Sequence, residues 1–247
     1  MKKVIFLHTQ RTGGTSFRDY VTQKHIFPIA FRSYIKDDII KKIYNSEKPF
    51  IEFEPGIYLE ELSLDFNYYT ILRSPIDRCL SWIELHSRIK SNGKGNLFNP
   101  RGVNDDYRYS EEFWEETYNI LKKLSKNFSI EFNLSNTYVK SLTNQQQKKN
   151  VEEEDLKLAF NNIKRMSVTI FDKNKMHDSI NKALDFYNFR SNRENYPVSM
   201  QGNNSVVDYC PQYVREFLAE VNFYDIQLYN YYESIKDEDN FTPPIIK

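Results

Sequence analysis

The stretch VIFLHTQRTGGTSF, residues Val4–Phe17, joins a short apolar run to a glycine-rich turn. Val4–Leu7 has the length and composition of a buried strand, and Thr15–Lys24 is expected to form a helix directly after the glycines. A strand that leads through such a turn into a helix leaves backbone N–H groups and the positive helix end pointing at one place. The stretch therefore predicts an anion site, suited to a phosphate or sulfate group.

The loop supplies the groups that such a site needs. Because glycine has no Cβ, Gly13 and Gly14 allow the backbone to come close to an anion. Positive charge and hydroxyl donors come from the other candidates, Arg11, Thr12, Thr15 and Ser16. A P-loop that binds ATP or GTP requires the pattern G-x-x-x-x-G-K-[ST], and no lysine precedes the hydroxyl residues here. A turn that merely connects strand and helix is the alternative interpretation.

Length and charge limit the possible functions. The 247 residues show no shift in composition that marks a boundary, so residues 1–247 are interpreted as a single domain. The 34 basic and 34 acidic residues cancel, and nothing in the overall charge favours nucleic acid or an anionic membrane surface. No signal-peptide pattern is present, and no stretch approaches the ~20 apolar residues that span a bilayer. We expect a cytoplasmic protein with a local anion site.

Strand and helix patterns alternate along the chain. Further strands are expected at Ile26–Phe31, Pro49–Glu54, Tyr68–Arg73 and Val168–Phe171. Helices are expected at Asp37–Tyr44, Pro75–Ile89, Glu111–Lys126, Glu152–Met166, His177–Tyr187, Gln212–Val221 and Tyr224–Ile235. This alternation favours an α/β fold with a P-loop-like parallel sheet covered by helices on both faces. In such folds ligands bind at the carboxyl ends of the strands, where the glycine-rich loop lies.

A second strand-to-helix unit lies in LRSPIDRCLSW, which ends the strand at Arg73. Ser74 has the chemistry of an N-cap, and Pro75 suits the first helical position. Ser81 follows two turns into the helix, on a different face from the apolar stripe that contains Leu80. Arg73 and Ser81 are therefore candidates for a second anion site. A surface arginine with a solvated serine is the alternative.

Two anion sites at two strand ends fit a nucleotide with phosphate groups at both ends, and here the sequence resembles a known family. HTQRTGGTS resembles the 5′-phosphosulfate loop of PAPS-dependent sulfotransferases of the family-2 type, similar to the heparan sulfate 2-O- and 6-O-sulfotransferases, and LRSPIDRCLSW resembles their 3′-phosphate motif. The resemblance extends to NLSNTYVKSL, Leu156–Phe189 and NFYDIQLYNYY, and so covers nearly the whole chain. The chain departs from the family by having Arg11 where lysine is usual, and by lacking the membrane anchor of the Golgi members.

The resemblance implies in-line transfer of a sulfuryl group from PAPS to an acceptor hydroxyl or amine, with PAP as the product and no metal required. The acceptor would be a small molecule or a saccharide, and a peptide tyrosine remains open. Arg190 and Arg193 lie in FRSNRENYP, which resembles the loop that closes over the 3′-phosphate, although a solvated charge cluster is the alternative. The segment Lys90–Tyr109 has the length and composition of a mobile loop that covers the acceptor.

Transfer to a hydroxyl also requires a base. Family members place a His or Glu near the end of the strand between the two motifs, which here is PFIEFEPG. Glu54 occupies that place, and Glu52 shares its strand face because side chains alternate along a strand. Glu52 is expected to assist Glu54 or to tune its pKa. The alternative is an edge strand with a solvated polar face. His8 either touches the cofactor or is held by a backbone carbonyl.

Two other classes of function stay open at this point. One is a P-loop-like kinase or nucleotide hydrolase, and the other is a non-catalytic nucleotide-binding module. The histidines show no metal-ligand spacing, so no metal site is expected. Cys79 and Cys210 are assigned no role.

Overall fold

The computed structural model describes residues 2–9, 11–12, 17, 26–29, 41, 43–53, 66–88, 97–99, 107, 110–124, 134–143, 145, 148, 150–189 and 206–245. Among these residues, no helix combines the length and apolar character needed to cross a membrane.

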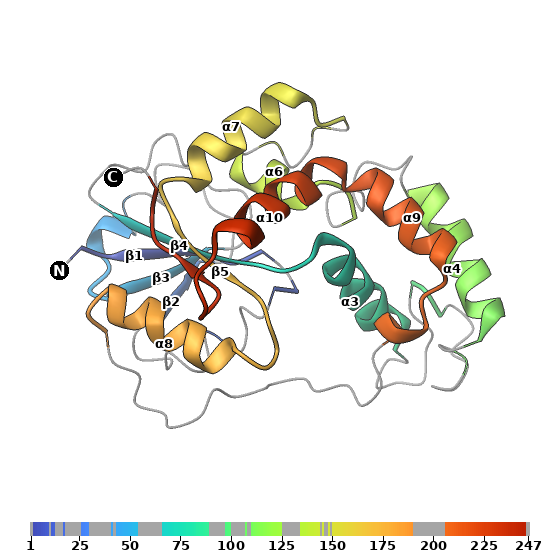
Figure 1. Ribbon diagram of the computed structural model, residues 1–247, viewed down its shortest axis with the longest axis horizontal. Helices are drawn as coiled ribbons and strands as arrows, with labels where there is room; N and C mark the ends of the chain where they lie inside the picture. The colour runs from blue at the N-terminus through green and yellow to red at the C-terminus, as the bar shows by residue number, and fades with distance from the viewer. Residues whose placement is uncertain are drawn as a thin grey trace.

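A mostly parallel sheet forms the centre of the described structure (Figure 1). Its strands are β1 (Val4–Leu7), β2 (Ile26–Ile29), β3 (Phe50–Phe53), β4 (Asn67–Leu72), β5 (Ser167–Ile170) and β6 (Phe241–Thr242). In the described ranges they pair in the order β2-β3-β1-β4-β5-β6, and only the β5–β6 pair is antiparallel. β1 therefore lies inside the sheet, with β3 on one side and β4 on the other.

Helices cover both faces of this sheet (Figure 1). The described helices are α3 (Pro75–Ser87), α4 (Glu111–Leu124), α6 (Thr137–Leu142), α7 (Glu153–Ile163), α8 (Met176–Phe186), α9 (Gln212–Val221) and α10 (Phe223–Ile235), with a 3-10 turn at Val206–Tyr209. α6, α7 and α10 pack on one face and α8 on the other, while α3, α4 and α9 gather beyond the end of β4. The α/β fold class predicted from the sequence is confirmed.

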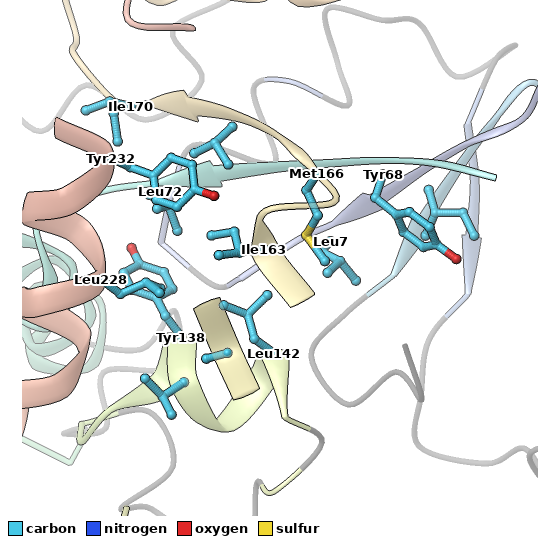
Figure 2. Close-up of a cluster of buried hydrophobic side chains, with 14 of the residues drawn as sticks. Leu7, Tyr68, Leu72, Tyr138, Leu142, Ile163, Met166, Ile170, Leu228 and Tyr232 are labelled. Carbon is cyan, nitrogen blue, oxygen red and sulfur yellow. The ribbon is translucent and has the colours of Figure 1, made fainter. Parts of the chain in front are cut away.

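Alternation along β1 divides the core between the two faces. Ile5 and Leu7 belong to the cluster beneath α6, α7 and α10, whereas Val4 and Phe6 belong to the cluster beneath α8. All of β1 is buried, as expected for a strand covered on both faces. Figure 2 shows the first cluster, in which Leu7 and Leu72 from the sheet meet Tyr138 and Leu142 from α6.

The predicted elements agree with the structure to within a few residues at their ends, as is usual for frayed termini. Two short elements were not predicted, the helix α6 and the strand β6. Both are shorter than the window over which an apolar period can be recognised, so contacts from distant segments define them. The helices predicted at Thr15–Lys24 and Asp37–Tyr44 lie mostly outside the described residues.

Candidate anion-binding site

The sheet brings the two predicted motifs to one edge. β1 and β4 are parallel neighbours in the register Leu7↔Thr70, so their carboxyl ends lie side by side. The loop that follows Leu7 and the turn that follows Leu72 therefore start from adjacent strands. This is the edge where parallel α/β sheets bind ligands.

Arg11 reaches across this edge to the second motif. Its Nε and Nη2 atoms both donate to Ser81 Oγ, at 3.1 and 2.9 Å. Arg11 has φ 68°, a left-handed conformation that is uncommon outside glycine. The turn is braced by Thr12, whose hydroxyl donates to the carbonyl of Thr9 at 2.7 Å. A side chain of the glycine-rich loop and the proposed 3′-phosphate serine therefore contact each other directly.

Ser81 lies in a buried environment on α3, with 5% of its surface exposed. The alternative of a solvated serine is therefore wrong. The start of α3 agrees with the prediction: the side chain of Ser74 accepts from the amide of Asp77 at 3.5 Å, and Pro75 stands in the first turn. A well-defined N-terminus fixes the direction of the helix, and with it the place of Ser81.

Arg73 is the second cation of the site. Its Nη1 donates to the carbonyl oxygen of Arg11 at 3.4 Å, and its guanidinium lies 5.0 Å from the ring centroid of Phe171. Burial lowers the pKa of Arg73 and also that of Arg11, whose pKa is lowered further by the charge of Arg73. Arginine stays protonated despite such shifts, so the site holds two partly desolvated positive charges. An anion bound between them would relieve this repulsion.

One buried carboxylate moderates this positive charge. Glu84 follows Ser81 on α3, and its Oε1 pairs with Arg88 Nη2 at 2.9 Å. The charge of Glu84 raises the pKa of Arg11 and opposes the effect of burial. Among the described residues, the charges that act on Arg11 and Arg73 also include Arg78, Arg88, Glu84 and Asp77. Four arginines thus face two carboxylates, and the local charge is positive although the whole chain is neutral.

The predicted base region has a different partner from the one expected. Glu52 Oε1 lies 2.6 Å from His8 Nδ1, and the two side chains are 3% and 12% exposed. β3 is an inner strand between β2 and β1, so the alternative of an edge strand with a solvated polar face is wrong for Glu52. The ring of His8 stacks on Phe6, with centroids 5.6 Å apart. His8 is thus held by the carboxylate of Glu52, and the described residues show no bond from its ring to a backbone carbonyl.

A small cavity lies beside this pair, at the carboxyl ends of β1 and β4. Its volume is about 10 Å³, which is room for roughly one water molecule. It is lined by Leu7, His8, Thr9, Thr70, Leu72, Tyr138, Ser141 and Leu142. His8 and Tyr138 therefore border the same space.

Several predicted site residues lie outside the described part of the chain, namely Gly13, Gly14, Thr15, Ser16, Glu54, Arg190 and Arg193. Most of the segment Lys90–Tyr109 lies outside it as well. Their roles stay predictions. Within the described ranges, no group of three or more His, Cys, Asp or Glu residues could hold a metal ion.

Two residues of the site were missed by sequence reasoning. Phe171 covers the guanidinium of Arg73, and the Tyr138 hydroxyl binds the backbone of Arg73. Tyr138 lies in NLSNTYVKSL, a segment that the family resemblance includes, yet no local pattern connects it with a residue 65 positions away. Only the pairing of β4 with β5 brings Phe171 next to the end of β4.

Comparisons with known proteins add little to this geometry. No protein-family model matches the chain, and no curated protein matches it. Among solved structures, the chain is similar to a sulfotransferase from Alicyclobacillus acidocaldarius, with a TM-score of 0.47 and 11% sequence identity over 93% of this chain and 96% of that chain. Values this low do not define a function.

Proposed function

We propose that the protein is a sulfotransferase that moves the sulfuryl group of PAPS to an acceptor hydroxyl or amine. The observation that supports this most directly is the contact between Arg11 and Ser81. It joins the loop that resembles a 5′-phosphosulfate site to the helix that resembles a 3′-phosphate site. A nucleotide with phosphate groups at both ends would present one group to each motif, whereas a nucleoside triphosphate needs a single phosphate cradle.

In this proposal one group of residues binds each end of the nucleotide. The loop from Arg11 to Ser16 binds the 5′-phosphosulfate, and Arg73 and Ser81 bind the 3′-phosphate. Arg190 and Arg193 close over the 3′-phosphate. The acceptor oxygen or nitrogen forms a bond to sulfur while the bond from sulfur to the 5′-phosphate oxygen breaks, and that oxygen leaves with the electron pair as part of PAP. Arg11 stabilises the charge that develops there.

The acceptor must give up a proton during transfer, and Glu54 is the proposed base. The contact between His8 and Glu52 favours a second candidate. A carboxylate that accepts a hydrogen bond from Nδ1–H fixes the tautomer in which Nε2 accepts a proton. In that version Glu52 orients His8 instead of tuning Glu54.

The acceptor is proposed to be a small molecule or a saccharide, and the reaction as proposed needs no metal ion. These points follow from the family resemblance together with the charge of the site. A neutral chain with a local arginine cluster is suited to one anionic nucleotide and not to a nucleic acid.

Thermal unfolding with nucleotides tests the proposal. PAP should raise the melting temperature without Mg²⁺, and at 100 times its dissociation constant it should add about 2.7 kcal/mol to the free energy of unfolding. AMP, which lacks the 3′-phosphate, should have a much smaller effect and serves as the matched control. A shift that needs both ATP and Mg²⁺ would indicate a kinase or nucleotide hydrolase instead. PAP binding without transfer to any acceptor would indicate a binding module.

A further inference from the structure

The hydroxyl group of Tyr138 binds both polar groups of the Arg73 backbone. It accepts from the amide of Arg73 at 2.9 Å and donates to the carbonyl of Arg73 at 2.8 Å. Tyr138 is 1% exposed, and burial raises the pKa of its phenol, so the group keeps the proton that it donates. Arg73 is the first residue after β4, where the hydrogen bonds of the strand end. The Tyr138 hydroxyl therefore makes the backbone hydrogen bonds that a neighbouring strand would otherwise make with Arg73.

The position of Tyr138 is fixed by an exchange of caps between α6 and α10. Asp225 of α10 accepts from the amides of Tyr138 and Val139 at 2.8 and 2.9 Å, at the start of α6. In return, Asn136 Oδ1 accepts from the amides of Tyr224 and Asp225 at 3.0 and 3.1 Å, at the start of α10. A helix as short as α6 is not stable alone, so its place depends on α10.

The side chain of Arg73 is held by other groups. Its guanidinium lies over Phe171 and donates to the carbonyl of Arg11. The backbone and the side chain of Arg73 are thus anchored by separate groups, one from α6 and the others from the residue that follows β5 and from the glycine-rich loop. Holding an arginine in one geometry before it binds an anion lowers the entropy cost of binding.

We propose that Tyr138 is a positioning residue for the 3′-phosphate site, which sets the direction of Arg73 by binding both polar groups of its backbone. This inference rests on the proposed function and goes beyond it, because it assigns part of the nucleotide affinity to a residue that does not touch the nucleotide. The reciprocal caps of α6 and α10 extend this support into the core.

Two tyrosine substitutions in the same core test the inference (Figure 2). Tyr138→Phe removes the hydroxyl that binds Arg73, whereas Tyr232→Phe removes a buried hydroxyl for which the described part of the chain offers no hydrogen-bond partner. Titration calorimetry with PAP and with AMP gives the readout. Tyr138→Phe should weaken PAP binding by roughly 5- to 30-fold and AMP binding by less than about twofold, because a lost buried hydrogen bond of this kind affects only the 3′-phosphate contact. Tyr232→Phe should change neither PAP binding nor AMP binding. Arg73→Ala shows how much PAP affinity is lost when the arginine side chain itself is removed.

The outcomes separate this inference from the proposed function. If the unaltered protein fails to bind PAP, the proposed function is wrong, and the positioning role is wrong with it. If it binds PAP and Tyr138→Phe binds equally well, or loses PAP and AMP alike, only the positioning role is overturned. Amide hydrogen exchange of the unaltered protein gives a check that needs no variant. The Arg73 amide should exchange as slowly as those of β4, and fast exchange would contradict the inference.

Discussion

Arg11 stands where the 5′-phosphosulfate loops that this sequence resembles usually have a lysine. The structure shows which contacts the arginine side chain makes. Lysine offers a point charge, whereas the guanidinium offers a planar fork. Here two nitrogens of that fork meet one hydroxyl of Ser81. Arg11 can therefore bridge the two halves of the proposed nucleotide site through several N–H groups held in one plane. The ammonium group of a lysine is a compact point charge without this planar fork.

Substitution of Arg11 tests its role in transfer. If Arg11 stabilises charge on the leaving phosphate, Arg11→Ala should lower the single-turnover rate by about 100-fold or more, as for the loss of an oxyanion donor. Arg11→Lys should keep much more activity because the charge remains. Ser81→Ala removes the contact and leaves the charge of Arg11, and because Ser81 is also a proposed 3′-phosphate donor, its single-turnover rate is compared at saturating PAPS. Equal losses in Arg11→Lys and Arg11→Ala would show that fork geometry matters and charge alone does not.

The two candidate bases can be separated by carboxamide substitutions. If Glu54 is the base, Glu54→Gln should lower the transfer rate by on the order of 10² to 10⁴ and hardly change PAP binding. Glu52→Gln should then do less. If His8 is the base, His8→Asn should be strongly impaired because the ring that takes the proton is lost. Glu52→Gln should then be strongly impaired as well, because the carboxylate that orients the ring is lost. Single-turnover rates of the three variants, with PAP affinity as the control, decide between them.

At the scale of elements, the exchange of caps between α6 and α10 buries an acid. Burial raises the pKa of Asp225 to about 6, against the opposing effects of Arg78 and of the amides of Tyr138 and Val139. The folded protein therefore holds a proton on the Asp225 carboxyl group more tightly than the unfolded chain does. For this reason, Asp225 contributes most to the free energy of unfolding below about pH 4. That contribution is lost as the pH rises to about 6, and amounts to roughly 3 kcal/mol.

Urea unfolding between pH 4 and pH 7 measures this effect. The parent protein should lose stability across this range relative to Asp225→Asn, whose amide does not titrate. Asp185→Asn, on the exposed face of α8, is the matched control and should follow the parent. Parallel pH curves for the parent and Asp225→Asn would contradict the assigned role of burial.

The same elements show how far sequence reasoning reaches. The unit around β1 and the unit around β4 and α3 were predictable because their signals are local: an apolar run, paired glycines, and Ser74 followed by Pro75. The short helix α6 was not predictable, because its first amides are capped by Asp225. This residue lies 87 positions after Tyr138 and 86 positions after Val139. The base region was predicted in part. The carboxylates were recognised, but the pairing of Glu52 with His8 depends on the register of β1 and β3.

For the molecule as a whole, charge is balanced overall and concentrated locally. The chain has 34 basic and 34 acidic residues, yet in the described structure the charges near Arg11 and Arg73 are two further arginines, Arg78 and Arg88, and two carboxylates, Asp77 and Glu84. Attraction of a multiply charged nucleotide should therefore depend on a few close charges and not on the net charge.

Salt dependence tests this arrangement. Raising NaCl from about 0.05 to about 0.5 M should weaken PAP binding by roughly tenfold, because screening acts on the exposed part of the arginine cluster. The midpoint of urea unfolding should change little, since the net charge of the protein is zero. Calorimetry and unfolding at each salt concentration provide the two readouts. An affinity independent of salt would contradict an electrostatic site.

The sheet order also has a consequence for folding. β1 is completed by β3 on one side and by β4 on the other, and β4 in turn pairs with β5. A fragment of the chain that ends before Asn67 thus contains the whole glycine-rich loop but lacks β4, the strand that flanks β1 on one side. Contacts between segments so far apart in sequence form slowly, and they leave apolar strand edges exposed in the meantime. The proposed nucleotide site is therefore expected to form late in folding, and a complementary fragment that supplies β4 and β5 should restore it.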